Sequence, residues 1–373
     1  MGISGKLRER LRSRRDRWLA DPRFSAFAAR SPFLRPIVRR RVLSLFDLAA
    51  GFVYAQVLAA VVELDLPERL RDGPLALTDL ARRVDLPPER MAVLVEAASA
   101  LGILERGESE SVRLGPHGAA MLADPGIAAM VRHHVHLYRD LADPVALLRE
   151  PEPPGALSSY WAYAGRPAGE GPDVTADTRS YTTLMARSQA MIAREVVAAY
   201  PFARHRHMLD IGGGDGTFIA RVGEAAPRLA FTLFDLPNVA EPSKTVLPDD
   251  IAGRTHVVGG NFTTDPLPKG ADLVTLVRIL HDHDDAIVRT LLASVHAALD
   301  AGGRILVAEP MAGTRGAERV ASAYFGFYLL AMGQGRPRRK EELADMLKAA
   351  GFRHVREHRT NLPALVRVIS AQR

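Results

Sequence analysis

The sequence of 373 residues predicts an α/β protein, with a mainly α-helical N-terminal domain followed by a mostly parallel, Rossmann-like sheet. Its length exceeds the roughly 100 to 200 residues of one typical domain, which favours two domains. From residue 206 onward, apolar segments of strand length alternate with helical patterns, as in repeated strand–helix units. Before them, two helical segments and a small hairpin form a winged-helix pattern. We place a basic arm at 1–40, the helical domain at 41–180 and the sheet domain at 181–373.

The composition excludes several classes of protein. Cysteine is absent, which rules out disulfides, thiolate metal sites and a cysteine nucleophile, and suits a reducing cytoplasm. The N-terminus lacks an apolar stretch of signal-peptide length, and no later segment provides about 20 uncharged apolar residues. We therefore expect a cytoplasmic protein that does not cross a membrane, with peripheral contact at the inner membrane as an option.

Positive charge is concentrated at the N-terminus. Residues 1–45 contain 13 Lys or Arg and 3 Asp or Glu, a local charge of +10 that leaves −4 for the remaining chain. Such an arm is either a solvated helix that packs on its own domain or a segment that contacts an anionic membrane surface. Nucleic acid is not the partner that we expect.

The helical domain begins with an apolar helix predicted at Phe46–Leu64, which we expect to be buried or shared between two subunits. A short helix opened by Thr78, a longer helix after Pro88 and a hairpin near 105–114 follow it. This winged-helix unit binds DNA in regulators, whereas in many methyltransferases a similar unit dimerises and covers the substrate. The unit alone therefore does not decide the function.

A glycine-rich turn follows the first strand of the sheet domain. Gly212, Gly214 and Gly216 lie between this strand and a helix, where glycine lets the backbone approach a ligand closely. The GxGxG spacing, with Asp210 just before it, differs from the GxGxxG of dinucleotide-binding proteins and favours S-adenosylmethionine. Asp210 would hold the methionine part of that cofactor, either directly or by fixing the loop.

The next two strands end in further candidate cofactor residues. Asp235 closes the second strand, nineteen residues after Gly216, where a carboxylate accepts hydrogen bonds from both ribose hydroxyls of an adenosine. Leu236 follows it and is placed in the same site. After the third strand, we expect Asn261 to bond the exocyclic amine of adenine and Phe262 to lie against the ring, with an ordinary loop as the alternative.

A candidate catalytic pair follows the fourth and fifth strands. The carboxyl ends of these strands should place His281 and Glu309 in the same crevice as the glycine turn. Methyl transfer from a sulfonium to a hydroxyl needs alignment and removal of the hydroxyl proton. His281 can remove this proton, and Glu309 can hold the other ring N–H and stabilise the imidazolium. A purely structural histidine is the alternative.

The run HDHDD at 281–285 also suggests a metal site, since some methyltransferases orient catechols with a divalent ion. We favour the interpretation that Asp284 and Asp285 begin the next helix, where they face the positive end of its dipole. We therefore predict no metal. A surface or substrate-lining role is also favoured over metal binding for three histidines on an earlier helical stretch, His133, His134 and His136.

From about residue 45 to the end, the sequence resembles the plant-type small-molecule O-methyltransferases, which join a winged-helix dimerisation domain to a class I methyltransferase domain. The motifs that carry the resemblance are LDIGGGDG, FDLPNV, GGNF, HDHDD, VAEP and KAAGF. The resemblance implies a homodimer, S-adenosylmethionine as cofactor, His281 as catalytic base and Glu309 as its support. It also matches Ser188, in LMARSQAM, to the helix that closes over the cofactor.

The sequence departs from this family pattern in several places. Glu341 or Glu342 is near the position of the family's second glutamate, which has no secure counterpart. Arg278 would take over cofactor binding from a lysine that plant members often carry one position earlier. The substituted positions are Asn261 for Asp, Phe262 for Met, His283 for Trp and Val277 for that lysine.

More narrowly, the run SPFLRPIVRRRVLSLFDLAAGFVYAQVLAAVVELDLPERL resembles the acyclic carotenoid O-methyltransferases of purple photosynthetic bacteria, which methylate hydroxyneurosporene and demethylspheroidene. This resemblance implies a lipophilic substrate with a tertiary hydroxyl, a poor nucleophile that needs His281 as base and a site closed to water. Because a carotenoid dissolves in membrane, the basic arm could rest on anionic lipid through its apolar residues, Trp18, Leu19, Phe24, Phe27 and Phe33.

Two alternatives to a carotenoid methyltransferase stay open. The first is a methyltransferase that acts on another pigment or a polyketide, such as a bacteriochlorophyllide. The second is a winged-helix, DNA-binding regulator with a non-catalytic methyltransferase domain. The intact set of chemical residues argues against the regulator, namely Asp210, Gly212, Gly214, Gly216, Asp235, His281 and Glu309.

Overall fold

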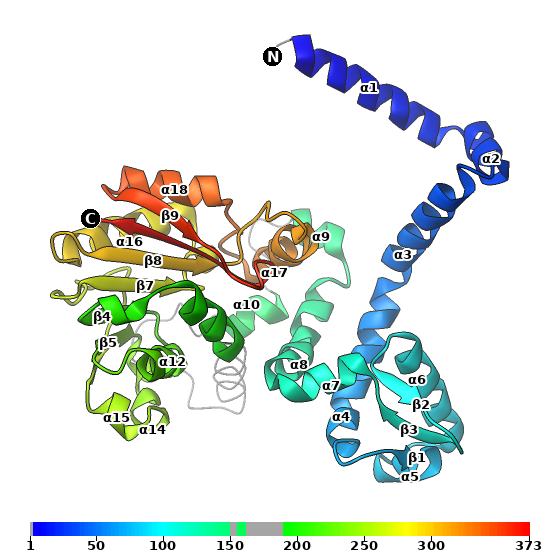
Figure 1. The fold of residues 1–373 in the computed structure, drawn as a ribbon, viewed down its shortest axis with the longest axis horizontal. Helices are drawn as coiled ribbons and strands as arrows, with labels where there is room; N and C mark the ends of the chain where they lie inside the picture. The colour runs from blue at the N-terminus through cyan, green and yellow to red at the C-terminus, as the bar shows by residue number, and fades with distance from the viewer. Residues whose placement is uncertain (1–2, 150–154, 162–188) are drawn as a thin grey trace. The chain divides into compact units, whose positions relative to one another are not determined.

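The computed structural model describes residues 3–149, 155–161 and 189–373 (Figure 1). The chain forms two compact units, Met1–Ala119 and Ala120–Arg373. The predicted domain boundary between residues 180 and 181 lies outside the described residues.

The first unit begins with three helices, α1 (Ile3–Ala20), α2 (Pro22–Arg30) and α3 (Arg35–Glu63). Asp21 caps α2, since its carboxylate accepts the N–H of Arg23 at 2.8 Å. Helix α3 starts eleven residues before the predicted Phe46 because nothing in the basic stretch from Arg35 interrupts it, and arginine is a good helix former.

The apolar side of α3 is largely uncovered within one chain. Only Val61 and Val62 are buried, whereas Phe46 is 64% and Phe52 is 73% exposed. An 18-residue window of α3 has a mean hydropathy of 1.9, so the helix is long and apolar enough to cross a membrane by length and composition. The expectation that no segment provides about 20 uncharged apolar residues still holds, because the uncharged part of α3 between Asp47 and Glu63 has 15 residues. The composition is weak evidence for a span, because a helix covered by a second subunit shares it.

The rest of the first unit has the winged-helix arrangement that the sequence predicts. The strands β1 (Leu75–Ala76), β3 (Ser111–Leu114) and β2 (Leu104–Arg106) form an antiparallel sheet in this order. Its helices are α4 (Leu66–Arg69), α5 (Leu77–Arg83), α6 (Pro88–Ala100) and α7 (Pro116–Ala123), the last of which runs into the second unit. Fully buried side chains from these elements form its core, including Leu80, Met91, Val95, Leu104 and Val112.

The second unit is built on a seven-stranded sheet of order β6-β5-β4-β7-β8-β10-β9. Strands β4 to β8 are parallel, and β10 pairs antiparallel with both β8 and β9. Their bounds are β4 His207–Ile211, β5 Ala230–Asp235, β6 Thr255–Gly259, β7 Leu273–Val277, β8 Arg304–Glu309, β9 Arg353–His358 and β10 Arg367–Gln372. The α/β class and the mostly parallel sheet are therefore confirmed.

Helices cover both faces of this sheet, which is why every residue of β7 is buried. One core joins the sheet to α16 (Asp285–Ala298) and α18 (Lys340–Ala349), and the other joins it to α12 (Thr217–Ala225) and the helical residues 189–199 (Figure 1). Shorter helices in the loops are α13 (Pro237–Ala240), α14 (Ser243–Val246), α15 (Asp249–Ala252) and the 3₁₀ turns η2 (Phe202–Arg204) and η3 (Leu280–Asp282).

A helical layer accompanies the sheet. It contains α8 (Pro125–Asp140), α9 (Pro144–Arg149), α10 (Ala156–Trp161), the π-helix η4 (Arg319–Tyr324) and α17 (Phe325–Met332). Buried side chains from α8, α9, α10 and α17 share one apolar cluster. Because β4 to β8 run parallel, the segments that follow them gather at one edge of the sheet, and this edge carries the candidate site.

Candidate active site

The turn between β4 and α12 requires glycine for two different reasons. Gly212, Gly214 and Gly216 have φ angles of +70°, +59° and +84°, a left-handed conformation that side chains with a Cβ rarely adopt. A Cβ at Gly212 would also lie 2.2 Å from Cδ1 of Ile279, whereas a Cβ at Gly214 would have no heavy atom within 4 Å. Gly214 thus borders open space, where a ligand can approach the backbone.

Asp235, at the end of β5, holds this turn in place. Its carboxylate accepts the N–H of Gly214 at 2.8 Å and that of Leu236 at 2.7 Å. Burial raises the pKa of Asp235 to about 6, although these two N–H groups act in the opposite direction. Each carboxylate oxygen keeps a further lone pair, so Asp235 can still accept hydrogen bonds from a diol.

Asp210 lies deeper and contacts the sheet. It is 2% exposed and accepts a hydrogen bond from the hydroxyl of Thr275, on β7, at 2.6 Å. Burial, with a contribution from the charge of Asp235, raises the pKa of Asp210 to about 7, against the hydrogen bond from Thr275. The carboxylate of Asp210 is therefore held against β7.

The segment after β6 forms a tight turn. The side-chain oxygen of Asn261 accepts both the N–H and the hydroxyl of Thr263, at 2.9 and 2.7 Å, and so caps this turn. The ring of Phe262 is half-buried and lies edge-on to His283, with centroids 5.2 Å apart.

The structure brings His281 and Glu309 together. His281 is 5% exposed and lies on the 3₁₀ turn η3 that follows β7, while Glu309 is the last residue of the neighbouring strand β8. One oxygen of Glu309 accepts the N–H groups of Ile279 at 3.0 Å and Leu280 at 2.7 Å, and the other bonds Nδ1 of His281. Glu309 therefore fixes both the ring and the main chain that carries it.

A second carboxylate, which sequence reasoning missed, lies on the other side of the ring. Nε2 of His281 is 3.1 Å from Oδ1 of Asp282. Burial lowers the pKa of His281, but Asp282 and Glu309 together outweigh it and raise this pKa above the ordinary value of 6.5, against the opposing charge of Arg278. The one sequence signal for this contact was that Asp282 directly follows His281.

Neither of the two glutamates considered from the sequence occupies this place. Glu342 accepts a hydrogen bond from Arg336 at 2.9 Å and from the N–H of Arg339 at 2.8 Å, at the start of α18. Glu341 lies 3.7 Å from the ammonium of Lys340. Both glutamates therefore make their contacts at the start of α18 and not with His281.

The remaining predicted residues are placed as follows. Arg278 directly follows β7 with a φ of +58°, and its N–H bonds the carbonyl of Ala308 at 2.8 Å. It is close enough to His281 and Tyr324 to influence their pKa values. Ser188 lies outside the described residues.

Aromatic side chains from η4 and α17 were not foreseen. Phe325 lies edge-on to His281, with centroids 6.0 Å apart. Beside it, the hydroxyls of Tyr324 and Tyr328 bond Nε2 of His134 and His133 at 2.9 and 2.8 Å. Burial lowers the pKa of His133 to about 4 and that of His134 below its ordinary value, and it raises the pKa of Tyr324 to about 12, so these three side chains are neutral at pH 7.

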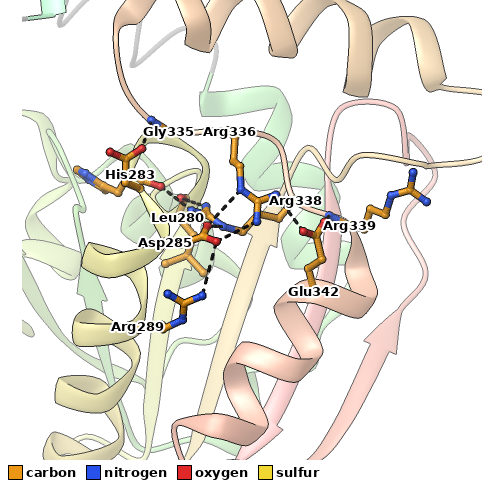
Figure 2. Close-up of polar contacts among 10 residues, drawn as sticks. Leu280, His283, Asp285, Arg289, Gly335, Arg336, Arg338, Arg339 and Glu342 are labelled. Carbon is orange, nitrogen blue, oxygen red and sulfur yellow. Dashed lines mark hydrogen bonds and ion pairs between the residues drawn. The ribbon is translucent and has the colours of Figure 1, made fainter. Parts of the chain in front are cut away.

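The acidic residues after His281 are used by the protein itself. Asp284 stands at the N-cap position of α16, where its carboxylate accepts the N–H of Gly335 at 3.1 Å and not one from the helix. Asp285 binds Arg336 and Arg338 (Figure 2). Within 3–149, 155–161 and 189–373, no group of three or more His, Asp or Glu side chains is arranged to hold a metal ion. The metal-assisted alternative thus gains no support from these carboxylates.

Comparison with known families and proteins agrees with this geometry. An O-methyltransferase domain matches residues 138–353, and an O-methyltransferase dimerisation domain matches residues 46–124. Demethylspheroidene O-methyltransferase of Cereibacter sphaeroides is 45% identical over 90% of this chain and 88% of its own length. The enzyme of the same name from Rhodobacter capsulatus is 42% identical over 92% of this chain and 85% of its own length. Aclacinomycin 10-hydroxylase RdmB of Streptomyces purpurascens is 32% identical over 81% of this chain and 82% of its own length.

Solved structures show the same relationship. Human N-acetylserotonin methyltransferase in complex with SAM aligns with a TM-score of 0.74 and 26% identity, over 89% of this chain and 97% of that structure. The mitomycin 7-O-methyltransferase MmcR aligns with a TM-score of 0.75 and 25% identity, over 91% and 99%. With its glycine turn, its buried histidine–glutamate pair and these matches, the chain belongs to the family of S-adenosylmethionine-dependent O-methyltransferases.

Proposed function

We propose that this enzyme methylates the tertiary hydroxyl of an acyclic carotenoid of the hydroxyneurosporene or demethylspheroidene type, with His281 as the general base. The observation that carries the catalytic part is the buried imidazole of His281, held by Glu309 at Nδ1. The substrate is inferred from the two demethylspheroidene O-methyltransferases, which are similar over most of their length.

The residues at the sheet edge fit S-adenosylmethionine. The backbone of Gly212–Gly216 borders open space at Gly214 and would receive the methionine part, with Asp210 fixing the loop from below. Asp235 would accept the ribose hydroxyls. Further candidate contacts to the cofactor are Leu236, Asn261 and Phe262 toward the adenine, and Arg278 and Ser188.

When bound, S-adenosylmethionine supplies an electrophilic methyl group on a positively charged sulfur. A tertiary alcohol is a poor nucleophile, so its proton must leave as the new carbon–oxygen bond forms. His281 accepts this proton at Nε2, because Nδ1 donates to Glu309. The resulting imidazolium has Glu309 on one side and Asp282 on the other, and both carboxylates stabilise its charge.

The apolar α3 and the basic arm support two further proposals. The dimerisation domain, from residue 46, includes most of the uncovered apolar stretch of α3, which a second copy of the chain would cover in a homodimer.

In α1 and α2, Trp18, Leu19 and Phe27 are exposed among basic residues, which suits peripheral contact between a cytoplasmic enzyme and an anionic membrane. Such contact would give the enzyme access to a membrane-dissolved substrate.

The proposed reaction is tested with methyl-labelled S-adenosylmethionine and a panel of hydroxylated carotenoids, phenols and chlorophyllides. We expect label in the carotenoid product, and we expect His281→Ala to lower the single-turnover rate by roughly 10²–10⁴ while cofactor affinity stays nearly unchanged. Glu309→Gln should lower this rate less than His281→Ala does, because Glu309 orients the ring without taking the proton. Labelled phenol or chlorophyllide alone would refute the carotenoid assignment, and an active His281→Ala variant would refute the base.

The role of Asp235 is tested by calorimetry. We expect Asp235→Ala to weaken S-adenosylmethionine binding by about tenfold or more, because a ribose diol then loses charged hydrogen bonds. Glu224→Gln is a matched control, since Glu224 lies on the adjacent helix α12 and, among the described residues, forms its ion pair with the exposed Arg221. Equal affinities for the two variants would remove Asp235 from the cofactor site.

The charges around His281 predict the pH dependence. A base must be neutral, so kcat/KM should rise with pH through an apparent pKa above 6.5, the value from which Asp282 and Glu309 raise it. Arg278 and His283 also face this ring, and neither replaces the missing carboxylate when Asp282 is changed. Asp282→Asn should therefore shift the profile to lower pH, whereas an unchanged profile would assign the titration to another group.

Deletion of residues 1–30 separates the two roles given to the N-terminal half. We expect the truncated enzyme to remain a dimer in sedimentation, because α3 begins only at Arg35. It should lose flotation with vesicles that contain anionic lipid, whereas the full chain floats with these and not with neutral vesicles. A monomeric full chain would contradict the dimer, and equal flotation of both proteins would contradict the role of the arm.

A further inference from the structure

A second segment, residues 333–339, lies against the turn that carries His281. It connects α17 to α18, and the N–H of Arg336 donates to the carbonyl of His281 at 2.9 Å. Gly335, with a φ of +79°, comes so close that a Cβ there would lie 2.2 Å from the same carbonyl oxygen. The segment is therefore packed directly on the backbone of the catalytic turn.

The side chain of Arg338 enters this contact. Its guanidinium donates to the carbonyls of Leu280 and His283, which flank His281 on both sides, and to the carboxylate of Asp285 at 2.7 Å (Figure 2). Arg338 is only 2% exposed. Because a buried carbonyl without a donor is costly, the planar guanidinium fixes where both carbonyls lie.

Two residues thus hold the turn from opposite sides. Glu309 accepts the N–H groups of Ile279 and Leu280 and bonds the ring of His281. Arg338 donates to the carbonyls on the other side of the same turn. N–H and C=O groups of the turn thus both have side-chain partners, which restrain the main chain that carries the imidazole.

We propose that Arg338 is a positioning residue for methyl transfer, which holds the main chain around His281 so that Nε2 stays aligned with the substrate hydroxyl. This inference rests on the proposed role of His281 as the base. A base that moves by about 1 Å from its reactive position loses on the order of 10²-fold in rate, so a residue that touches no substrate can still affect the chemical step.

Three arginines bind Asp285 but differ in their contact with the turn, which gives a matched series. The side chain of Arg289 is 63% exposed and reaches Asp285 at 3.7 Å. That of Arg336 is 42% exposed and binds Asp285 and Glu342. Only Arg338 also donates from its side chain to the turn.

The experiment compares Arg338→Met, Arg338→Lys, Arg336→Gln and Arg289→Gln in the full chain, with labelled S-adenosylmethionine and a hydroxylated carotenoid. We expect Arg338→Met to lower the single-turnover rate by about 10- to 100-fold. The rate of Arg338→Lys should fall less, because lysine can donate to one of the two carbonyls. Arg336→Gln should lower the rate only slightly, and Arg289→Gln should have the rate of the wild type. Affinity for S-adenosylmethionine and the KM of the carotenoid should change by less than about threefold in all four.

A second readout separates positioning from a general structural role. In a His281→Ala background, Arg338→Met should cause no further loss of rate, because there is no longer a base to position. Arg338→Met with the activity of Arg289→Gln, or with a full additional loss beside His281→Ala, would overturn the inference. So would failure of both Arg338 variants to fold and bind S-adenosylmethionine. If His281→Ala itself retains its rate, the proposed base fails, whatever the Arg338 variants show.

Discussion

The hydrogen bond between His281 and Glu309 joins the two neighbouring strands β7 and β8 at the reactive edge of the sheet. An isolated buried carboxylate would be costly, and the three hydrogen bonds to Glu309 offset that cost. The same turn also reaches the glycine turn, since Ile279 occupies the space that a side chain at Gly212 would need. The position of the His281 ring and the shape of the glycine turn are therefore set by one piece of backbone.

This edge of the sheet is also rich in carboxylates. Burial raises the pKa of Asp210 and of Asp235, and Asp282 lies next to the imidazole. A cation brought to this edge stabilises the charged form of each carboxylate, which favours a sulfonium cofactor over an anionic dinucleotide. If His281 takes the hydroxyl proton as proposed, the carboxylates of Glu309 and Asp282, which flank its ring, would stabilise the imidazolium. The same carboxylates can thus stabilise the sulfonium before methyl transfer and the imidazolium after it.

The sequence was sufficient to predict the parts of the site that depend on strand order. Parallel strands end at one edge, so Asp235 after β5 and Glu309 after β8 could be placed near the glycine turn without coordinates. The direction of a side chain within a turn has no such rule, which is why the contact of Asp282 with the His281 ring and the bonds from Thr263 to the Asn261 oxygen were missed. Arg338 follows His281 by 57 residues, and nothing in its local pattern indicates that it returns to the catalytic turn.

The length of α3 was underestimated for a related reason, because its basic first part was interpreted as an arm and only its apolar part as a helix. The two acidic residues of α3, Asp47 within it and Glu63 at its end, bear on what covers its exposed apolar surface. They bracket 15 uncharged residues, which rise only about 22 Å in a helix, less than the roughly 30 Å of a bilayer core. A span would bury Asp47 in hydrocarbon, whereas a second subunit can cover the apolar side and leave this carboxylate at the rim of the interface. Since the matched dimerisation domain starts at residue 46, the uncovered side of α3 is best explained as a surface for another copy of the chain.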